Sequence, residues 1–338
     1  MRIVHGLKKL FHVNPSAFGC DITDHSIRVA ELKRVGSTLT LKSFGFHVLP
    51  EGTVVNGELR DAPGLAQHLR QALTELKGEK LRTPYVIASL PDPQCFLRIV
   101  QLPKLSSEEV PQALMAEIEA NIPLALSDVY YAWDIANPAT DKDHLDIMVA
   151  AAPKALVDQY VSAFVEAGFK PMAFEIDALA TVRSVISQQA AGESRPLLLI
   201  DIAYNRATFL IYANGMVRFT ASVPHNAKAD SDVNTKVFAQ TLALQARSYM
   251  DFFATHATHT HLPFADVRRA VICGDDFYGS DLAAVLTVAL GIPVELANPW
   301  VNILTPPLRE VPLLPYKESL GYTAALGLAL RAHQEFST

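Results

Sequence analysis

The stretch FGCDITDHSIRVAEL (18–32) has an outline that returns in the second half of the chain as LLLIDIAYNRATFLIY (197–212). Each stretch reads as a strand carrying Asp-Ile at its end, a short polar turn and a second strand. The aspartates of the two pairs are Asp21 and Asp201. A hairpin duplicated in this way predicts two related domains that face each other across a cleft.

The composition fits a chain of that size and organisation. The chain has 338 residues, of which 50% are hydrophobic and 19% are charged. Such a chain can bury a large core, most simply in two domains, and is not disordered. A net charge of -6 without a long basic run argues against nucleic-acid binding. Cys20, Cys95 and Cys273 form no CxxC pair, which is typical of structural thiols in a reducing cytoplasm.

The first eleven residues, MRIVHGLKKLF, place apolar side chains at helical spacing with Arg2, Lys8 and Lys9 between them. We expect a basic amphipathic leader over residues 1–16, and residues 1–11 can contact an anionic membrane surface. The alternative is a tail that docks on the domain or nowhere, since one short helix binds membranes weakly by itself. The chain shows no signal peptide and no apolar run of membrane-spanning length.

Between the hairpins, segments typical of strands and of amphipathic helices follow each other in mixed order. The clearest are a strand at 98–105 and helices at 62–78, 106–123, 154–169 and 233–256. Mixed order predicts an α/β fold built in layers. The segment AAGESRP (190–196) is a natural boundary between two domains. With one hairpin in each domain, this is the arrangement of the actin-like (ribonuclease H-like) ATPase fold.

Five further segments carry a resemblance to a known family. They are DITDHSIRVAELKR (21–34), LPEGTVVNGELRD (49–61), RIVQLPKLSSEEVPQALMAEIEANIPLALSDVYYAWDI (98–135), GIPVELANPW (291–300) and AALGLALR (324–331). In sequence and in order they resemble the PilM family, actin-like proteins of type IV pilus assembly that are related to the division protein FtsA. The phrases around LPEG and GIPVE are more specific than a generic phosphate loop.

The resemblance implies a division of the chain into actin-like domains with a small α/β insertion. The implied parts are the leader at 1–16, a first domain at 17–83 and 170–192, an inserted partner-binding subdomain at 84–169, and a second domain at 193–338 with a helical subdomain at about 225–268. The implied function is a scaffold on the cytoplasmic face of the inner membrane. It would bind the N-terminal cytoplasmic tail of a PilN-like membrane protein, contact other platform and motor proteins of the pilus, and could self-associate.

The family commonly binds ATP with magnesium, so the resemblance also implies nucleotide-binding positions. Matched to this chain, they are Asp21, Ser26, Asp201, Thr208, Arg247 and Gly274, with magnesium near Asp21 and Asp201. Glu175 and Asp177 match the acidic segment between the two halves. Either carboxylate could position a water on a metal-bound phosphate, or both could simply cap the following helix.

Five residues replace the small residues that are usual around the family's nucleotide. They are Thr23, Asp24, Ala203, Asp275 and Asp276. A carboxylate about 5 Å from one phosphate charge costs roughly 3 kcal/mol at an effective dielectric near 20, which is about a hundredfold in affinity. We therefore expect a degenerate cleft with weak or absent ATPase activity, in which TDHS is an ordinary turn. The alternative is a functional Mg-ATP-binding ATPase that drives conformational change in the same machine.

Apolar residues of the inserted subdomain are the predicted groove for the partner's tail. They are Ile99, Leu102, Met115, Ile118 and Ile122. A peptide could dock there through apolar anchors or by pairing with a strand edge. The alternative is that these side chains fill the core of the subdomain itself.

Overall fold

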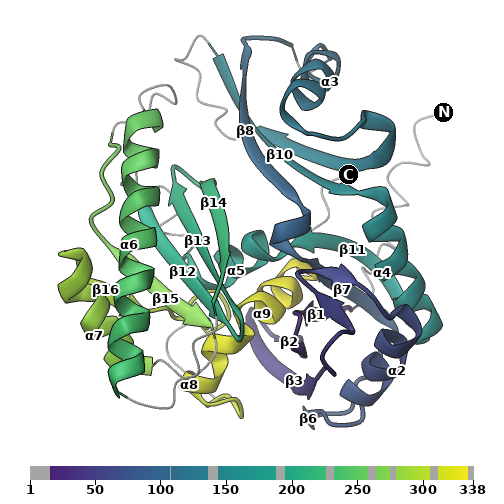
Figure 1. Cartoon of the computed structure of the whole chain (residues 1–338). Helices are drawn as coiled ribbons and strands as arrows, with labels where there is room; N and C mark the ends of the chain where they lie inside the picture. The colour runs from purple at the N-terminus through teal and green to yellow at the C-terminus, as the bar shows by residue number, and fades with distance from the viewer. Residues whose placement is uncertain are drawn as a thin grey trace.

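The computed structural model of the chain describes residues 16–106, 108–135, 144–187, 195–225, 232–257, 264–274, 279–304 and 311–333. The expected leader lies outside the described residues except for Ser16, and so do Asp275 and Asp276. Two halves, each built on a sheet, lie beside each other, and a smaller unit stands above them (Figure 1). Among the described residues, no helix is both long and apolar enough to cross a membrane.

The first sheet has six strands in the order β11-β7-β1-β2-β3-β6. Their bounds are β1 (Phe18–Ile22), β2 (Ser26–Val35), β3 (Thr38–Val48), β6 (Lys77–Gly78), β7 (Tyr85–Leu90) and β11 (Lys170–Ile176). β1 pairs antiparallel with β2 and parallel with β7, and β7 pairs parallel with β11. Every residue of β1 is buried, which explains why this strand reads as an apolar run rather than an alternation.

The second sheet repeats this plan with five strands in the order β14-β13-β12-β15-β16. Their bounds are β12 (Leu197–Ala203), β13 (Arg206–Ala213), β14 (Met216–Pro224), β15 (Ala270–Gly274) and β16 (Val294–Leu296). β12 pairs antiparallel with β13 and parallel with β15, as β1 does with β2 and β7. Asp21 lies opposite Arg28 in the first hairpin, and Asp201 lies opposite Thr208 in the second. The duplicated hairpin predicted from the sequence is therefore confirmed.

The smaller unit is a three-stranded antiparallel sheet of order β8-β10-β9 with one helix. Its elements are β8 (Phe96–Pro103), α3 (Val110–Asn121), β9 (Val129–Ile135) and β10 (His144–Pro153). The expected insertion limits, 84–169, are too wide. β7 belongs to the first sheet through its pairing with β1. The helix α4 (Lys154–Glu166) packs on the core of that sheet through Leu156 and Tyr160.

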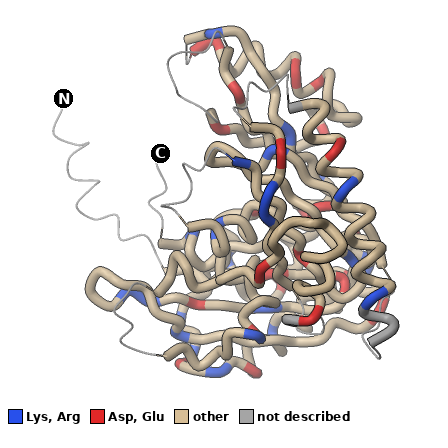
Figure 2. The backbone as a smooth tube through the Cα atoms, turned by 90° about the vertical axis from the view of Figure 1, so that its left-hand side faces the viewer, with Lys and Arg blue, Asp and Glu red and all other residues tan. Residues whose placement is uncertain are grey.

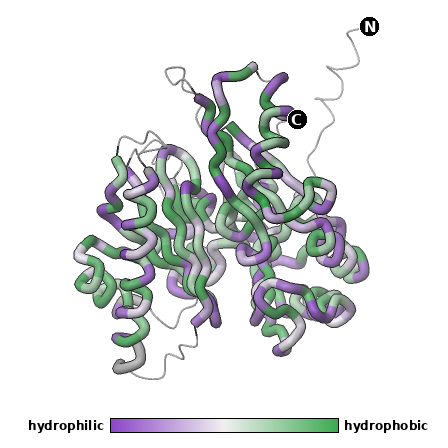
Figure 3. Tube along the Cα trace, turned by 45° about the horizontal axis from the view of Figure 1, so that its top comes forward, coloured by the Kyte–Doolittle hydropathy of each residue, from purple (hydrophilic) through white to green (hydrophobic). Residues whose placement is uncertain are grey.

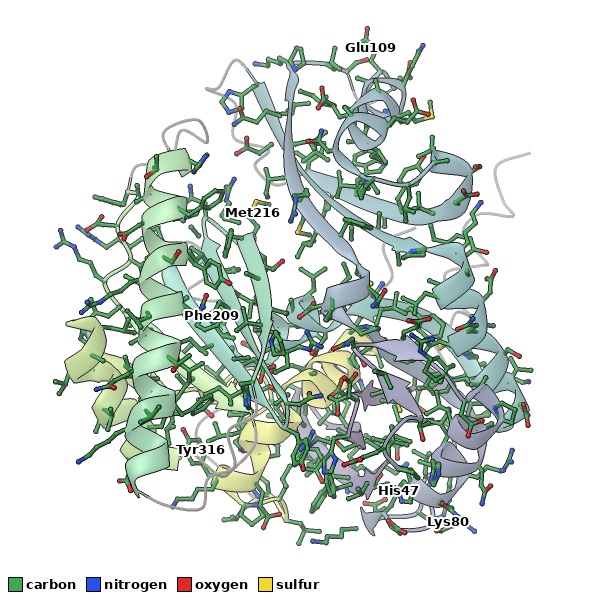
Figure 4. All side chains as sticks on the ribbon, in the orientation of Figure 1. His47, Lys80, Glu109, Phe209, Met216 and Tyr316 are labelled. Carbon is green, nitrogen blue, oxygen red and sulfur yellow. The ribbon has the colours of Figure 1, made fainter. Side chains whose placement is uncertain are left out.

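Helices cover the faces of the two main sheets. The first is covered by α2 (Ala62–Ala72) and α4, and the second by α6 (Asp232–Ala257) and α7 (Gly279–Leu290). Hydrophobic residues gather along the strands within each half (Figure 3). The expected helical subdomain at 225–268 is wrong for the described residues. Leu242 and Phe253 of α6 share one core with Phe209 of β13, so α6 covers the sheet (Figure 4).

Two helices cross between the halves with almost no space between their backbones. They are α5 (Asp177–Val185) and α9 (Thr323–Arg331), with the short α8 (Tyr316–Ser319) before α9. A Cβ atom added to Gly327 of α9 would overlap the carbonyl oxygen of Ala180 of α5. One added to Gly19 of β1 would overlap the carbonyl oxygen of Ala325. Glycine at both positions is therefore required for α9 to lie between α5 and the first sheet.

A buried ion pair joins the inserted sheet to the second domain. Arg218 Nη1 of β14 lies 3.1 Å from Asp146 Oδ2 of β10, with side chains that are 1% and 0% exposed. Gln101 Nε2 donates a hydrogen bond of 3.0 Å to the other oxygen of Asp146. Both charges are removed from water, so each depends on the other for its stability.

Replacing Gly327 with alanine tests the helix crossing. Alanine favours a helix over glycine by about 1 kcal/mol, yet its Cβ must push α9 away from Ala180. We expect Gly327→Ala to lower the free energy of unfolding by about 1–3 kcal/mol, the usual cost of overpacking, measured by urea denaturation. The control Ser248→Ala, at an exposed position of α6, should stay within about 0.5 kcal/mol. An unchanged midpoint for Gly327→Ala would contradict the close crossing.

Removing one partner of the buried ion pair should cost more than replacing both. Asp146→Ala leaves the Arg218 charge buried without its carboxylate, and we expect a loss of about 3–5 kcal/mol in urea unfolding. The double variant Asp146→Leu with Arg218→Met should recover most of that loss. Glu58→Ala, which breaks the exposed pair with Arg60, is the matched control and should change stability by less than about 1 kcal/mol. An equal loss in the free energy of unfolding in the single and double variants would show that the unpaired charge of Arg218 does not cause the destabilisation.

Candidate functional site

The turn of the first hairpin holds a carboxylate that is bound by backbone amides. Asn56 and Gly57, in the turn between β4 (Val54–Val55) and β5 (Glu58–Leu59), donate N–H hydrogen bonds of 2.8 Å each to the two oxygens of Asp24. Both donors have positive φ, 51° and 78°. Backbone amides turned together in this way form a concave anion site. The added acid of the hairpin therefore has a specific partner, which its position in the sequence did not reveal.

The second hairpin meets the first directly at the same place. Asn205 Nδ2 donates a hydrogen bond of 3.2 Å to Asp24 Oδ2. The rings of His25 and Tyr204 stack, with centroids 3.8 Å apart and planes 9° apart. Arg206 Nη2 donates to Asn56 Oδ1 over 3.0 Å. The two hairpin turns are thus in contact with each other across the cleft.

Behind these contacts lies a cavity of about 50 Å³. Its lining includes Asp24, Asp92, Asp177, Asp201, Ala203 and Thr208. Sites for drug-sized ligands measure about 300–1,000 Å³, so a space of this size accommodates a few water molecules. The described residues in this conformation do not fit a nucleoside triphosphate.

Carboxyl groups gather around the cavity, and burial raises the pKa of two of them. Asp21 accepts a hydrogen bond of 2.9 Å from Ser89 Oγ. Burial, with a contribution from Asp21, raises the pKa of Asp92 to about 6, although a hydrogen bond from Ala178 N–H opposes the shift. Burial and then the charge of Asp21 raise the pKa of Asp177 well above its usual range. Burial and the neighbouring carboxylates both disfavour the charged form of each of these acids.

The described side chains form no group of three or more His, Cys, Asp and Glu residues placed to hold a metal ion. One oxygen of Asp177 is buried without a hydrogen-bond partner. Magnesium near Asp21 and Asp201 stays a prediction of the resemblance.

Other residues matched to the nucleotide site have partners within the protein. Ser26 Oγ accepts from Arg28 Nη1 at 3.0 Å, and Thr208 Oγ1 lies 2.8 Å from Ser222 Oγ. Gly274 has φ 109°, and a Cβ there would overlap the carbonyl of Ile202, which is a packing requirement. Arg247 donates from α6 to the carbonyl oxygen of Ala289 at the end of α7. Arg247 is absent from the lining of the cavity.

Of the two acidic candidates between the halves, only Asp177 faces the cavity. Glu175 is buried in two ion pairs. Arg183 binds its carboxylate through both terminal nitrogens, and Arg331 Nη1 lies 3.3 Å from it. Residues two apart in an extended strand point to the same face, but β11 ends at Ile176 and α5 begins at Asp177, so that rule does not hold for this pair. The carboxylate of Glu175 is bound by two arginines and does not line the cavity, so its role in positioning a water stays a prediction of the resemblance.

A groove of about 500 Å³ lies beside Glu175, between the inserted sheet and the first domain. Its walls include Tyr131, Trp133, Ala132, Ala150, Phe174 and Leu179. Tyr131 and Trp133 come from β9, Phe174 comes from β11, and the alanines come from β9 and β10. β9 is the edge of the inserted sheet, and β11 is the edge of the first sheet. The aromatic residues of VYYAWDI (129–135) are the sequence feature that corresponds to this groove.

The predicted partner residues do not form one surface. Leu102, Ile118 and Ile122 are buried in the core of the inserted subdomain, packed with Leu114 and Val149. These three positions are therefore wrong as groove residues. Ile99 is half-buried on the opposite face of β8, and Met115 is exposed on α3. Glu109, just before α3, accepts hydrogen bonds from the amide and the hydroxyl of Ser106 (Figure 4).

The repeated strand order, the facing hairpins and the crossing of α5 with α9 define an actin-like protein. The sequence profile of the family described as "Type IV pilus assembly protein PilM" matches residues 19–227. The chain belongs to this family.

Solved structures support the same fold. One is a chain of the "PilM-PilN type IV pilus biogenesis complex", with a TM-score of 0.73 and 22% identity over 94% of this chain and 99% of that one. Another is the ethanolamine utilization protein EutJ from Carboxydothermus hydrogenoformans, with a TM-score of 0.50 and 11% identity over 93% of this chain and 89% of that one.

The raised pKa of Asp92 gives a dependence of stability on pH. Between its usual value of 3.8 and about 6, the folded chain holds a proton that the unfolded chain releases. The stability that this group contributes is therefore full below the lower value and is lost as pH rises through about 6. We expect Asp92→Asn, which can still accept from Ala178, to raise the thermal midpoint at pH 7 and to flatten its fall between pH 4 and 6. The control Asp128→Asn, at an exposed position, should leave the dependence of the thermal midpoint on pH unchanged. If Asp92→Asn showed the same pH dependence as the wild type, the raised pKa of Asp92 would not be its cause.

Proposed function

We propose that this protein is a cytoplasmic scaffold of a type IV pilus assembly platform, peripheral to the inner membrane, with a nucleotide cleft that has become degenerate. In this role it binds the cytoplasmic tail of a PilN-like membrane protein and connects it to other platform and motor proteins. The observation that carries the proposal is the difference in volume between the cleft and the groove. The cleft between the hairpins offers about 50 Å³, whereas the groove beside β9 offers about 500 Å³.

The groove suits a short extended peptide. Edge strands have backbone groups that can pair with an added strand, and both β9 and β11 border the groove. Alanines at 132, 150 and 152 leave room for apolar side chains of the peptide. Tyr130 and Tyr131 are 48% and 40% exposed, and aromatic residues of this kind anchor interfaces.

The charges of the groove add polar recognition to this apolar surface. Arg183 and Arg331 share the carboxylate of Glu175, which leaves a net positive charge on this cluster, and Asp134 adds a second acidic side chain to the lining of the groove. Elsewhere, basic and acidic residues are scattered over the described backbone (Figure 2). A peptide with apolar side chains and an acidic or amide side chain between them would complement the groove.

Placing an arginine in the groove tests where the peptide binds. Ala132 is exposed on β9, so Ala132→Arg should fold while filling the groove. We expect affinity for a synthetic tail peptide of a PilN-like protein, measured by fluorescence anisotropy, to fall at least tenfold. The matched control is Ala116→Arg, the same change at an exposed alanine of α3 beside Met115. Loss of binding in Ala116→Arg but not in Ala132→Arg would place the peptide on α3 instead.

The second candidate function is a magnesium-dependent ATPase of the same fold. It is favoured by the position of Asp177, Asp201 and Thr208 around one cavity, where the family's nucleotide residues are expected. The scaffold proposal predicts no change in the thermal midpoint of the wild-type protein at millimolar Mg-ATP. A rise in the midpoint that Asp201→Asn abolishes would favour the ATPase.

A further inference from the structure

We infer that Asp24 is a built-in anion, which occupies the phosphate-binding turn and holds the two actin-like domains closed without a nucleotide. This inference deepens the proposed degenerate cleft and rests on it. The turn of the first hairpin is Thr23-Asp24-His25, so Asp24 places a negative charge at the tip of the hairpin.

The contacts of the carboxylate are those of a bound anion. Its two oxygens each accept one backbone N–H, from Asn56 and Gly57, at 2.8 Å. Hydrogen bonds to a charged acceptor are the strong ones, and two parallel bonds also fix its orientation. Asn56 holds a positive φ of 51°, which costs energy for a residue with a side chain. The hydrogen bond from the backbone N–H of Asn56 to Asp24 and the hydrogen bond that its side chain accepts from Arg206 offset that cost.

The same carboxylate connects the two domains. Asn205, in the turn of the second hairpin, donates to the oxygen that Asn56 also binds. Beside this hydrogen bond, His25 of the first hairpin stacks on Tyr204 of the second. We call Asp24, Asn56, Asn205 and the stacked pair His25–Tyr204 the clasp. The clasp brings the hairpins together where a nucleotide would otherwise separate them.

The clasp also accounts for the acids behind it. Arg206 reaches from the second hairpin to Asn56, and its charge opposes the rise in the pKa of Asp92. With the hairpins in contact, the cavity is small and its carboxyl groups are shielded from water. Opening the clasp would expose Asp92 and Asp177 to water and so lower their raised pKa values toward the ordinary range.

The test removes the charge at position 24. Asp24→Ser removes the carboxylate and leaves the amides of Asn56 and Gly57 without their acceptor. We expect hydrogen–deuterium exchange of the peptide covering 54–60 to become at least tenfold faster than in the wild type. We also expect inorganic phosphate and ATP, titrated separately by calorimetry, to bind the variant at least tenfold more tightly than the wild type. Unchanged exchange, or equal phosphate affinity in the two proteins, overturns the inference.

Two further variants separate the clasp from simpler explanations. Asp61→Ser removes an equal charge nearby, and serine preserves the cap that Asp61 provides to Gly64 N–H of α2. We expect the phosphate affinity of this variant to match that of the wild type. A gain in affinity equal to that of Asp24→Ser would reduce the effect to net charge and overturn the inference.

Asn205→Ala keeps Asp24 hydrogen-bonded to the amides of Asn56 and Gly57 but removes the hydrogen bond between the domains. It should speed exchange at 204–206 while 54–60 stays protected; protection unchanged at both segments overturns the bridge.

Peptide binding, measured on the same proteins, distinguishes the failure of this inference from the failure of the proposed function. The groove is formed by β9, β10, β11, α5 and α9 and includes no residue of the clasp. A wild-type protein that binds no tail peptide contradicts the scaffold. A protein that binds the peptide normally but keeps its exchange protection in Asp24→Ser contradicts the clasp alone.

Discussion

The close crossing of α5 and α9 is the constraint on which the rest of the structure depends. The backbone of Gly327 touches that of Ala180, and the backbone of Gly19 touches that of Ala325. α5 leads from the first sheet to the second, and α9 returns to the first. Because both helices are held this tightly, the two sheets keep one relation to each other. The hairpins that project from those sheets consequently meet at their turns, and the space between them is set by side chains such as Asp24 and Asn205.

Local patterns in the sequence predict the fold, because the features that define it are local. The two Asp-Ile hairpins are contiguous stretches, and their strands are buried on both faces, so each reads directly as a strand pair. The limits of the insertion depend instead on β7, a strand whose parallel partner β1 lies 68 residues earlier in the chain. Nothing in the letters of β7 shows which sheet it joins. The same is true of α6, whose apolar residues could equally cover a sheet or build a separate unit.

The sequence indicated which residues of the site carry the relevant chemistry, but it did not show which residues they contact in the folded chain. Sequence reasoning identified Asp24 as an added charge, but its effect depends on amides at 56 and 57 that approach it only in the folded chain. Glu175 carries the right chemistry for a catalytic base, yet its carboxylate is paired with Arg183 and with Arg331, which lies far along the chain. Leu102, Ile118 and Ile122 are apolar residues of the correct subdomain, and periodicity alone does not say whether such a face meets a core or a partner.

The buried pair of Arg218 with Asp146 has a mechanical consequence. β10 forms one wall of the groove and also carries Asp146. Arg218 lies on β14, an edge strand of the second sheet. A pull on a peptide held against β9 and β10 would therefore load both domains at once, rather than the inserted sheet alone. Separating two charges in a dry interior resists small displacements more stiffly than sliding apolar surfaces does. In the proposed scaffold, this ion pair would transmit load between the inserted sheet and the second domain.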